Sequence, residues 1–452
     1  MVLKNFRFVD EKMDALGTVT IHDGIITGFA GGGPFEENET GNGMVIDGSK
    51  LSPSCALPVI MPAFVDLHAH FRDPGPSESK TLPSELALPS EVIESASMAA
   101  AAGGFGTVIC MANTRPPIDT IQMAAALKTR SDALGLIDLY PAMSLTKGML
   151  GKGLSEITSL MGKDKLPPQP APLMLSEDGK DLADGTLFLA AMEEAKRIGI
   201  PISCHCDFGG DENNAVRRVI ELGKKAGCHI HIAHVSSSEA IETIRRTKAE
   251  ISSNAKLDSD DKTCFTLTCE ATPHHLCLTE EDSRRLGEKT WGAVNPPLRP
   301  EGDRKALIQA LFDGTVDVIA TDHAPHSRTD KEAGSPGFSG FETAFAAVYT
   351  VPGGAGLAGQ TKDTIGLKHL SSLMSAAPAR LLGLGASQKR GLRRGRILPG
   401  YKADLVVIDT DASWIVESAS FKSRGKNSPF VGRRLYGKIL MTLHSGRVVF
   451  QR

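Results

Sequence analysis

Between residue 58 and about residue 347, short apolar segments alternate with amphipathic segments along the chain. The apolar segments, which we expect to be buried strands, are 63–67, 107–111, 136–141, 173–175, 202–205, 230–234, 266–271 and 316–321. Helices are expected between them, including 90–102, 122–133, 186–198, 214–226, 238–250 and 301–312. Eight strands that alternate with helices over roughly 250 residues or more predict an α/β fold, the parallel (β/α)8 barrel of the TIM type.

The two ends of the chain have a different, β-like pattern. Residues 17–29 and 437–450 each contain two strand-like runs around a turn dipeptide, Asp23-Gly24 and Ser445-Gly446, and predict hairpins. We therefore expect residues 1–58 and 386–452 to form one small β-sandwich, and residues 59–385 to form the barrel with the catalytic site. The polar segment 252–262 is expected as an exposed insertion.

Composition excludes several classes of partner. A formal net charge of -3 gives no reason to expect nucleic acid or an anionic membrane, and the basic run 389–396 is short and broken by glycine. The apolar runs are too short to span a membrane, and the N-terminus lacks the apolar core of a signal peptide. The eight cysteines include no CxxC pair and fit a reducing compartment. We expect a cytoplasmic protein.

Polar residues gather at the expected strand ends. His68 and His70 follow the first strand two residues apart, so both imidazoles can point to one place. Barrels of this type carry their chemistry at the carboxyl ends of the strands, where His205, His234 and Asp322 are also expected. Four histidines and one aspartate would support two zinc ions, and a terminal aspartate can also act as a general base.

Alternatives exist for two of these positions. His231 competes with His234, but His234 shares a strand face with apolar residues, which fill barrel interiors, so we expect His234 to be the ligand. A ligand that bridges two metal ions could come from the segment LSEDGKD, which offers Glu177, Asp178 or a carboxylated Lys180. The residue pattern does not choose among these three.

Several long segments closely resemble the amidohydrolase superfamily, and specifically the class I dihydroorotases. They are DLHAHFRDPG, AAAGGFGTVICMANTRPPID, LTCEATPHHLCLTEED, NPPLRPEGDRKALIQAL and DVIATDHAPHS, followed by GRILPGYKADLVVID and FVGRRLYGKI. The resemblance implies that His68 and His70 bind one zinc ion, completed by Asp322, and that His205 and His234 bind the other. It favours Asp178 as the bridge, because bacterial relatives carry a bridging aspartate in a D-D-G motif that reads Glu177-Asp178-Gly179 here.

The resemblance also implies a substrate and its contacts. Arg72, Asn113, Asn295 and His326 would bind dihydroorotate, whose carboxylate suits a guanidinium. The implied reaction is the reversible cyclisation of N-carbamoyl-L-aspartate to (S)-dihydroorotate in pyrimidine biosynthesis, with Asp322 moving the proton. A homodimer that can associate with aspartate transcarbamoylase is also implied.

Two other functions compete with this one. A hydantoinase or allantoinase would share the architecture, but those relatives rely on a carboxylated lysine, and their substrates lack the dihydroorotate carboxylate. A metal-free scaffold subunit is the second alternative. The retained set of His68, His70, His205, His234 and Asp322 argues against a scaffold.

Overall fold

Eight short parallel strands form the barrel in this computed structural model, which describes residues 1–31, 43–51, 57–73, 90–160, 172–257, 265–350, 365–385 and 393–452. They are β6 (Phe64–Ala69), β7 (Phe105–Cys110), β8 (Asp138–Pro141), β9 (Leu175–Ser176), β10 (Ile202–Cys204), β11 (His229–Ile232), β12 (Thr266–Ala271) and β13 (Val318–Ile319). The strands pair in the orders β6-β7-β8 and β9-β10-β11-β12-β13. Parallel bridges from Met143 to Leu175 and from Ala69 to His323 join the two sheets at both seams. The predicted (β/α)8 barrel is therefore confirmed.

Helices pack around these strands. The described α-helices are α1 (Ile93–Ala102), α2 (Ile121–Leu134), α3 (Gly185–Ile198), α4 (Glu212–Ala226), α5 (Ser238–Leu257), α6 (Pro273–Cys277), α7 (Glu280–Leu286), α8 (Glu301–Phe312), α9 (Arg328–Glu332), α10 (Ala344–Thr350), α11 (Leu367–Ser371) and α12 (Ala377–Leu381). Every residue of β6 and β7 is buried, as expected for parallel strands covered on both faces.

One helix end differs from the prediction. The structure continues α5 to Leu257, whereas the sequence pattern placed an exposed insertion from residue 252. Polar residues do not end a helix unless glycine, proline or a cap intervenes, and SSNAKL contains neither glycine nor proline. The rest of that insertion, and residues 389–392 of the basic run, lie outside the described residues.

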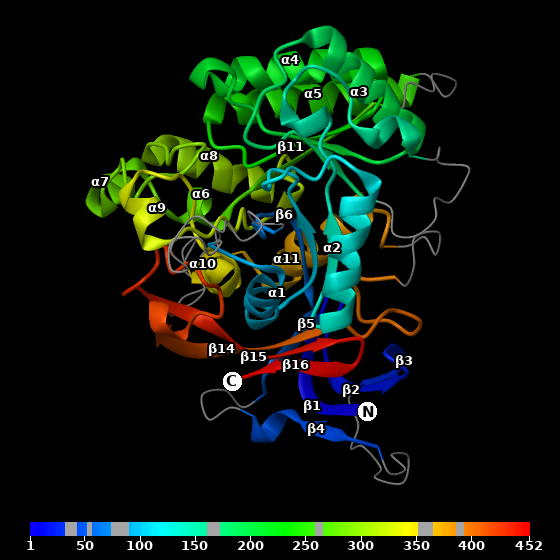
Figure 1. Ribbon diagram of the computed structural model, residues 1–452. Helices are drawn as coiled ribbons and strands as arrows, with labels where there is room; N and C mark the ends of the chain where they lie inside the picture. The colour runs from blue at the N-terminus through cyan, green and yellow to red at the C-terminus, as the bar shows by residue number, and fades with distance from the viewer. Residues whose placement is uncertain are drawn as a thin grey trace.

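The strands from the two ends of the chain form one hydrogen-bonded sheet. It contains β1 (Val2–Val9), β2 (Asp14–His22), β3 (Ile25–Gly31), β4 (Val45–Asp47), β5 (Val59–Pro62), β14 (Leu405–Ile415), β15 (Arg434–His444) and β16 (Arg447–Gln451). The strand order is β16-β15-β14-β5-β1-β2-β3, with β4 also paired to β1. Apolar residues from both ends of the chain, such as Phe6 in β1 and Leu443 in β15, share one core, so the sheet folds over into the expected sandwich. Figure 1 shows this sheet at one end of the molecule and helices α3 to α5 at the other.

Both predicted hairpins are present. Asp23-Gly24 joins β2 to β3, and Ser445-Gly446 joins β15 to β16, each with positive φ at both turn residues. The two turns touch, because a Cβ on Gly24 would lie 3.0 Å from the carbonyl oxygen of Ser445. The division into residues 1–58, 59–385 and 386–452 stays a prediction. Pairing of β5 with β14 favours a first boundary just after Pro62.

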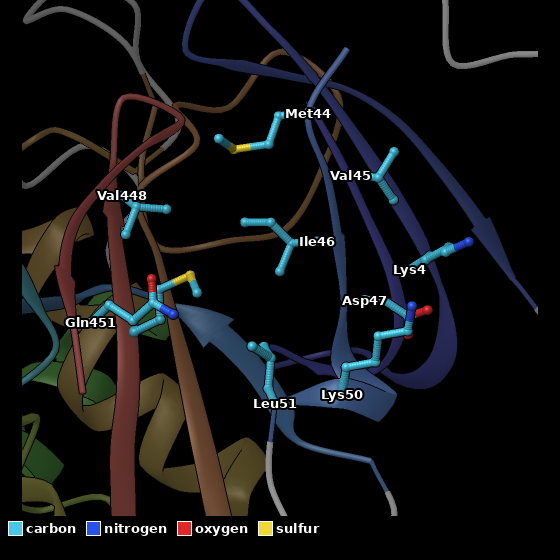
Figure 2. A pocket seen from close by; sticks show the side chains of 10 residues that line it. Lys4, Met44, Val45, Ile46, Asp47, Lys50, Leu51, Val448 and Gln451 are labelled. Atoms are coloured by element: carbon cyan, nitrogen blue, oxygen red, sulfur yellow. The ribbon is translucent and has the colours of Figure 1, made fainter. Parts of the chain in front are cut away.

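A groove of about 750 Å³ lies on the sandwich (Figure 2). Its walls come from the segment that contains β4 and from strands β15 and β16, with Met44, Ile46 and Val448 among the apolar lining residues. None of its lining residues belongs to the polar set expected at the barrel strand ends. The groove is therefore separate from the candidate active site.

Buried charges hold the barrel against the sandwich. Asp138, at the start of β8, contacts both Arg394 and Lys402. Asp404 lies 3.3 Å from Lys402 Nζ and 3.2 Å from His444 Nδ1. Burial would raise the pKa of Asp138, but the two cations lower it below its ordinary value. The two cations balance the two carboxylates, so we interpret this cluster as a structural ion network.

Removal of the Asp138 charge should destabilise the junction. In Asp138→Asn, Arg394 and Lys402 lose a carboxylate partner in a buried site, so we expect the free energy of unfolding to fall by about 3 kcal/mol. Denaturant unfolding of both proteins measures this change. The matched control is Glu332→Gln, which removes an exposed partner of Arg328 and should cost less than about 1 kcal/mol. Equal losses in the two variants would show that the junction network contributes no more than a surface pair.

Candidate active site

Polar side chains from five strand ends meet at one end of the barrel. The structure brings together all six residues predicted as metal ligands: His68, His70, Asp178, His205, His234 and Asp322. Two groups, His68–His70–Asp178 and Asp178–His205–His234, each hold their ligand atoms within 4.8 Å of one another. Asp178 belongs to both groups and lies between them, which is the position that a bridging ligand requires.

Asp322 lies beside the first group. Its Oδ1 is 3.1 Å from His70 Nε2 and 3.6 Å from His68 Nε2. Burial would raise the pKa of Asp322, but His68 and His70 lower it below its ordinary value, so this carboxyl is ionised at neutral pH. An ionised carboxylate next to a metal position can accept a proton.

The backbone is bent sharply at three of the residues that point into the site. Arg72, His234 and Asp322 have φ values of 58°, 30° and 45°, a region that non-glycine residues rarely occupy. Such a conformation costs roughly 1–3 kcal/mol for each residue and persists only when surrounding bonds hold it. The His234 N–H, for example, donates to Glu270 Oε1 at 3.1 Å. The positive φ changes the chain direction at each of these residues, where a strand gives way to a loop.

Glu270 is a functional residue that the sequence analysis missed. It is fully buried, and its two oxygens lie 2.7 Å from His68 Nδ1 and 3.1 Å from His231 Nε2. The carboxylate fixes the proton of His68 on Nδ1, which leaves Nε2 free for a metal ion. The sequence did contain one indication of its role, because Glu270 is the single charged residue in the predicted buried strand 266–271. The same contacts hold His231 away from the cluster, so His234, as expected, is the histidine that joins it.

Asp66 fastens the first barrel strand to the last. It accepts hydrogen bonds from the backbone N–H of Thr321 at 2.9 Å, from the Thr321 hydroxyl and from the His68 N–H at 3.2 Å. Burial raises the pKa of Asp66 to about 7 even though these donors oppose the shift. These bonds set the position of the His68-His70 segment relative to Asp322.

The two asparagines predicted to bind substrate both touch candidate ligands. Asn113 Oδ1 lies 2.9 Å from His70 Nδ1, and its Nδ2 donates to Asp178 Oδ2 at 2.8 Å. Asn295 Nδ2 lies 3.3 Å from His205 Nε2. Both side chains therefore help to orient the site.

The alternatives to Asp178 point elsewhere. Glu177 accepts hydrogen bonds from the backbone N–H groups of Leu145 and Thr146, at 2.9 and 3.0 Å. Lys180 Nζ donates to the carbonyl oxygen of Met149 at 2.9 Å. Neither residue belongs to the two groups of potential ligands found among the described residues at this site.

Arg72 and His326 lie together beside the cluster. Arg72 Nη2 is 3.3 Å from His326 Nε2, and that nitrogen lies 2.8 Å from the carbonyl oxygen of Pro336. Burial and the nearby Arg72 lower the pKa of His326 to about 4, so its ring is neutral at pH 7. Arg72 Nε is buried without a hydrogen-bond partner among the residues that the structure describes. An anionic ligand would supply the missing acceptor.

The chemistry of the donors fits a metal ion. Within the described part of the chain, His68 Nε2 is buried and makes no hydrogen bond, although Asp178 Oδ1 is 3.3 Å away. Burial opposes a charge on His68, but Asp178 and Glu270 raise its pKa well above the ordinary value. Imidazole and carboxylate donors suit zinc and related divalent ions. Cys204 and Cys206 are not part of this set, because their thiols contact backbone carbonyls.

Comparisons with known proteins agree with this geometry. The profile of the Amidohydrolase family matches residues 59–449. The dihydroorotase of Clostridium botulinum is 34% identical over the whole of both chains, and that of Deinococcus radiodurans is 32% identical over 96% of each. The L-hydantoinase (dihydropyrimidinase) of Arthrobacter aurescens superposes with a TM-score of 0.77 at 23% identity, covering 100% of this chain and 96% of that one. At that identity the solved structure supports the fold alone.

Loss of the Glu270 charge should weaken metal binding. In Glu270→Gln, His68 loses its carboxylate partner, so we expect about 10–100-fold weaker affinity for the metal ion of the first group. Titration of metal-loaded protein with a chelator, followed by metal analysis, measures the change. Glu250→Gln is the control, because Glu250 pairs only with Lys224 on the surface among the contacts that the structure describes. Unchanged affinity in Glu270→Gln would remove Glu270 from the metal site.

Proposed function

The chain belongs to the amidohydrolase family, and on that basis we propose that it is a dihydroorotase, which interconverts N-carbamoyl-L-aspartate and (S)-dihydroorotate in pyrimidine biosynthesis. Relatives with that name align with the chain from end to end. The observation that carries the proposal is Arg72, a half-buried guanidinium beside the His/Asp cluster whose buried Nε has no partner among the described residues. It provides a partner for the carboxylate of a substrate bound at the cluster.

We assign the roles of the site residues on this basis. His68, His70, His205 and His234, together with Asp178 and Asp322, would hold two zinc ions, with Asp178 shared between the two groups of ligands. Arg72 and His326 bind the carboxylate end of the substrate, while Asn113 and Asn295 contact the substrate from the cluster side. Asp322 is the catalytic acid and base.

The chain's own residues then perform the proton transfers. The metal pair, when bound, supplies Lewis acidity that acidifies water and polarises an amide carbonyl. Asp322 accepts the proton of the attacking water and delivers it to the ring nitrogen as the C–N bond breaks. The water oxygen stays on the former carbonyl carbon, and the product is N-carbamoyl-aspartate. The same steps in reverse close the ring.

The wider setting follows from the same assignment. We propose a cytoplasmic homodimer, with aspartate transcarbamoylase as a candidate partner. Among the described residues, no helix combines the length and the apolar character needed to cross a bilayer. The scaffold alternative is disfavoured because the six proposed metal ligands are present and lie together.

The substrate test compares three cyclic amides. The zinc-loaded protein should open dihydroorotate with a much higher kcat/KM than hydantoin or allantoin, because Arg72 requires a carboxylate to pair with. Ring opening is followed by absorbance and by product analysis. A preference for hydantoin or allantoin would contradict the proposal and favour the alternative cyclic amidases. Absence of both zinc and activity after reconstitution would favour the scaffold.

A variant at Asp322 tests the proton transfer. Asp322→Asn should retain most of its zinc, because the histidines and Asp178 remain, but lose at least about 100-fold in kcat, as is usual for a missing general base. Metal analysis and steady-state kinetics measure the two effects. Asp313→Asn, an exposed partner of Arg245, serves as the control and should keep both properties. Turnover close to that of the unmodified protein would exclude Asp322 as the base.

A further inference from the structure

The connection between β14 and β15 leaves the sandwich and lies against the active-site end of the barrel. We call residues 421–430 of this connection the strap, and residues 322–340, which follow β13, the β13 loop. The backbone N–H groups of Lys422 and Ser423 donate to Glu342 Oε1 at 2.7 and 3.1 Å. The N–H of Ser339 donates to the carbonyl oxygen of Asn427 at 3.3 Å. The strap is therefore attached to the β13 loop, which carries Asp322 and His326, at Ser339 and just beyond that loop at Glu342.

The side chain of Asn427 is buried and makes the central contacts of the strap. Its Oδ1 accepts the backbone N–H of His326 at 2.9 Å and lies 2.8 Å from the Ser339 hydroxyl. Its Nδ2 donates to the carbonyl oxygens of Ala324 and Gly337, at 3.2 and 3.0 Å. Both donor positions and one acceptor position of the amide are thus used, and the Ser339 hydroxyl, which also lies 2.8 Å from the Gly425 carbonyl oxygen, faces the second acceptor position.

Gly425 brings the strap into direct contact with the same part of the loop. A Cβ at this position would lie 2.6 Å from Pro325 Cβ and 2.8 Å from the backbone nitrogen of His326. The strap therefore fixes the backbone position of His326 by van der Waals contact as well as by hydrogen bonds.

A buried lysine extends this support to the neighbouring loop. Lys331 Nζ donates to the carbonyl oxygens of Ala293 and Gly337, at 2.9 and 3.0 Å, and to that of Ser335 at 2.9 Å. Gly337 is also a partner of Asn427, and Ala293 precedes Asn295 by two residues. One network thus joins the segments that carry two of the proposed substrate contacts.

We propose that Asn427 is a positioning residue for substrate binding, acting through His326. The sandwich domain, by this route, completes a binding site that lies in the barrel. The proposal rests on the proposed function, because it takes His326 as a contact to the substrate carboxylate end.

Two variants and one control test this role. Asn427→Ser replaces the amide by a shorter hydroxyl, and Gly425→Ala adds one methyl group against Pro325, the His326 nitrogen and Asn427 Oδ1, so each disturbs the contact between Asn427 and His326. Each should raise the KM for dihydroorotate about tenfold, as loss of one buried hydrogen bond does, and change kcat by less than about threefold. Ser428→Ala is the control, since its hydroxyl meets only the N–H of Phe430 among the described contacts. Unchanged KM in both Asn427→Ser and Gly425→Ala would overturn the proposal.

A double-variant cycle separates positioning from a general structural role. When His326→Asn has already removed the ring, adding Asn427→Ser should raise KM by no more than about twofold further, because coupled residues are not additive. If the two effects multiply instead, Asn427 does not act through His326. Metal content and melting temperature are recorded for every variant.

A readout without substrate distinguishes this proposal from the proposed function. The NMR signals of the His326 ring, assigned by their loss in His326→Asn, should shift in Asn427→Ser and Gly425→Ala but not in Ser428→Ala. Unmoved signals would contradict the positioning role even in an active dihydroorotase. Shifted signals in a protein that does not open dihydroorotate would instead refute the proposed function and retain the contact between Asn427 and His326.

Discussion

The contact between β6 and β13 closes the barrel, and the rest of the site depends on it. The His70 N–H donates to the carbonyl oxygen of His323 at 2.8 Å. Earlier in both segments, Asp66 accepts the N–H of Thr321. Without this seam, His68 and Asp322 would belong to opposite ends of a long chain segment, and the entropy of closing that loop would keep them apart. The buried Asp66 carboxyl specifies one arrangement of β6 and β13, because any other arrangement would leave some of its oxygens without hydrogen-bond donors.

Closure of the barrel concentrates charge among side chains that are nearly all buried. Asp178, Asp322 and Glu270 lie among four imidazoles, and each carboxylate has a histidine within 3.3 Å. Carboxylates so close together would repel one another if the histidines were neutral and no cation were present. The site is thus electrostatically balanced either by protons on the imidazoles or by metal ions, and the two exchange when metal binds.

The sequence was sufficient for features that depend on local periodicity. The alternation of apolar and amphipathic segments identified all eight barrel strands, and the turn dipeptides identified both hairpins. The choice of His234 over His231 followed from strand faces. Glu270 was missed because it lies inside strand β12, whereas the other polar residues of the site lie at strand ends. The choice of Asp178 over Glu177 and Lys180 depends on side-chain directions within a turn, which the sequence does not show. The strap has no periodic pattern from which its contact with His326 could be predicted. These features are tertiary contacts between segments far apart in the chain.

The sandwich also has a consequence for the order in which the chain acquires its structure. Strand β5 pairs with β1 on one side and with β14 on the other, and β14 to β16 are made last. A ribosome that adds about 5–20 residues per second therefore leaves one edge of β5 open for tens of seconds while the whole barrel is synthesised. An open edge of this kind can pair with other chains, so the nascent protein has to keep it covered until β14 emerges. The strap, which lies between β14 and β15, is synthesised equally late. The proposed substrate site is therefore complete only after these residues have been made.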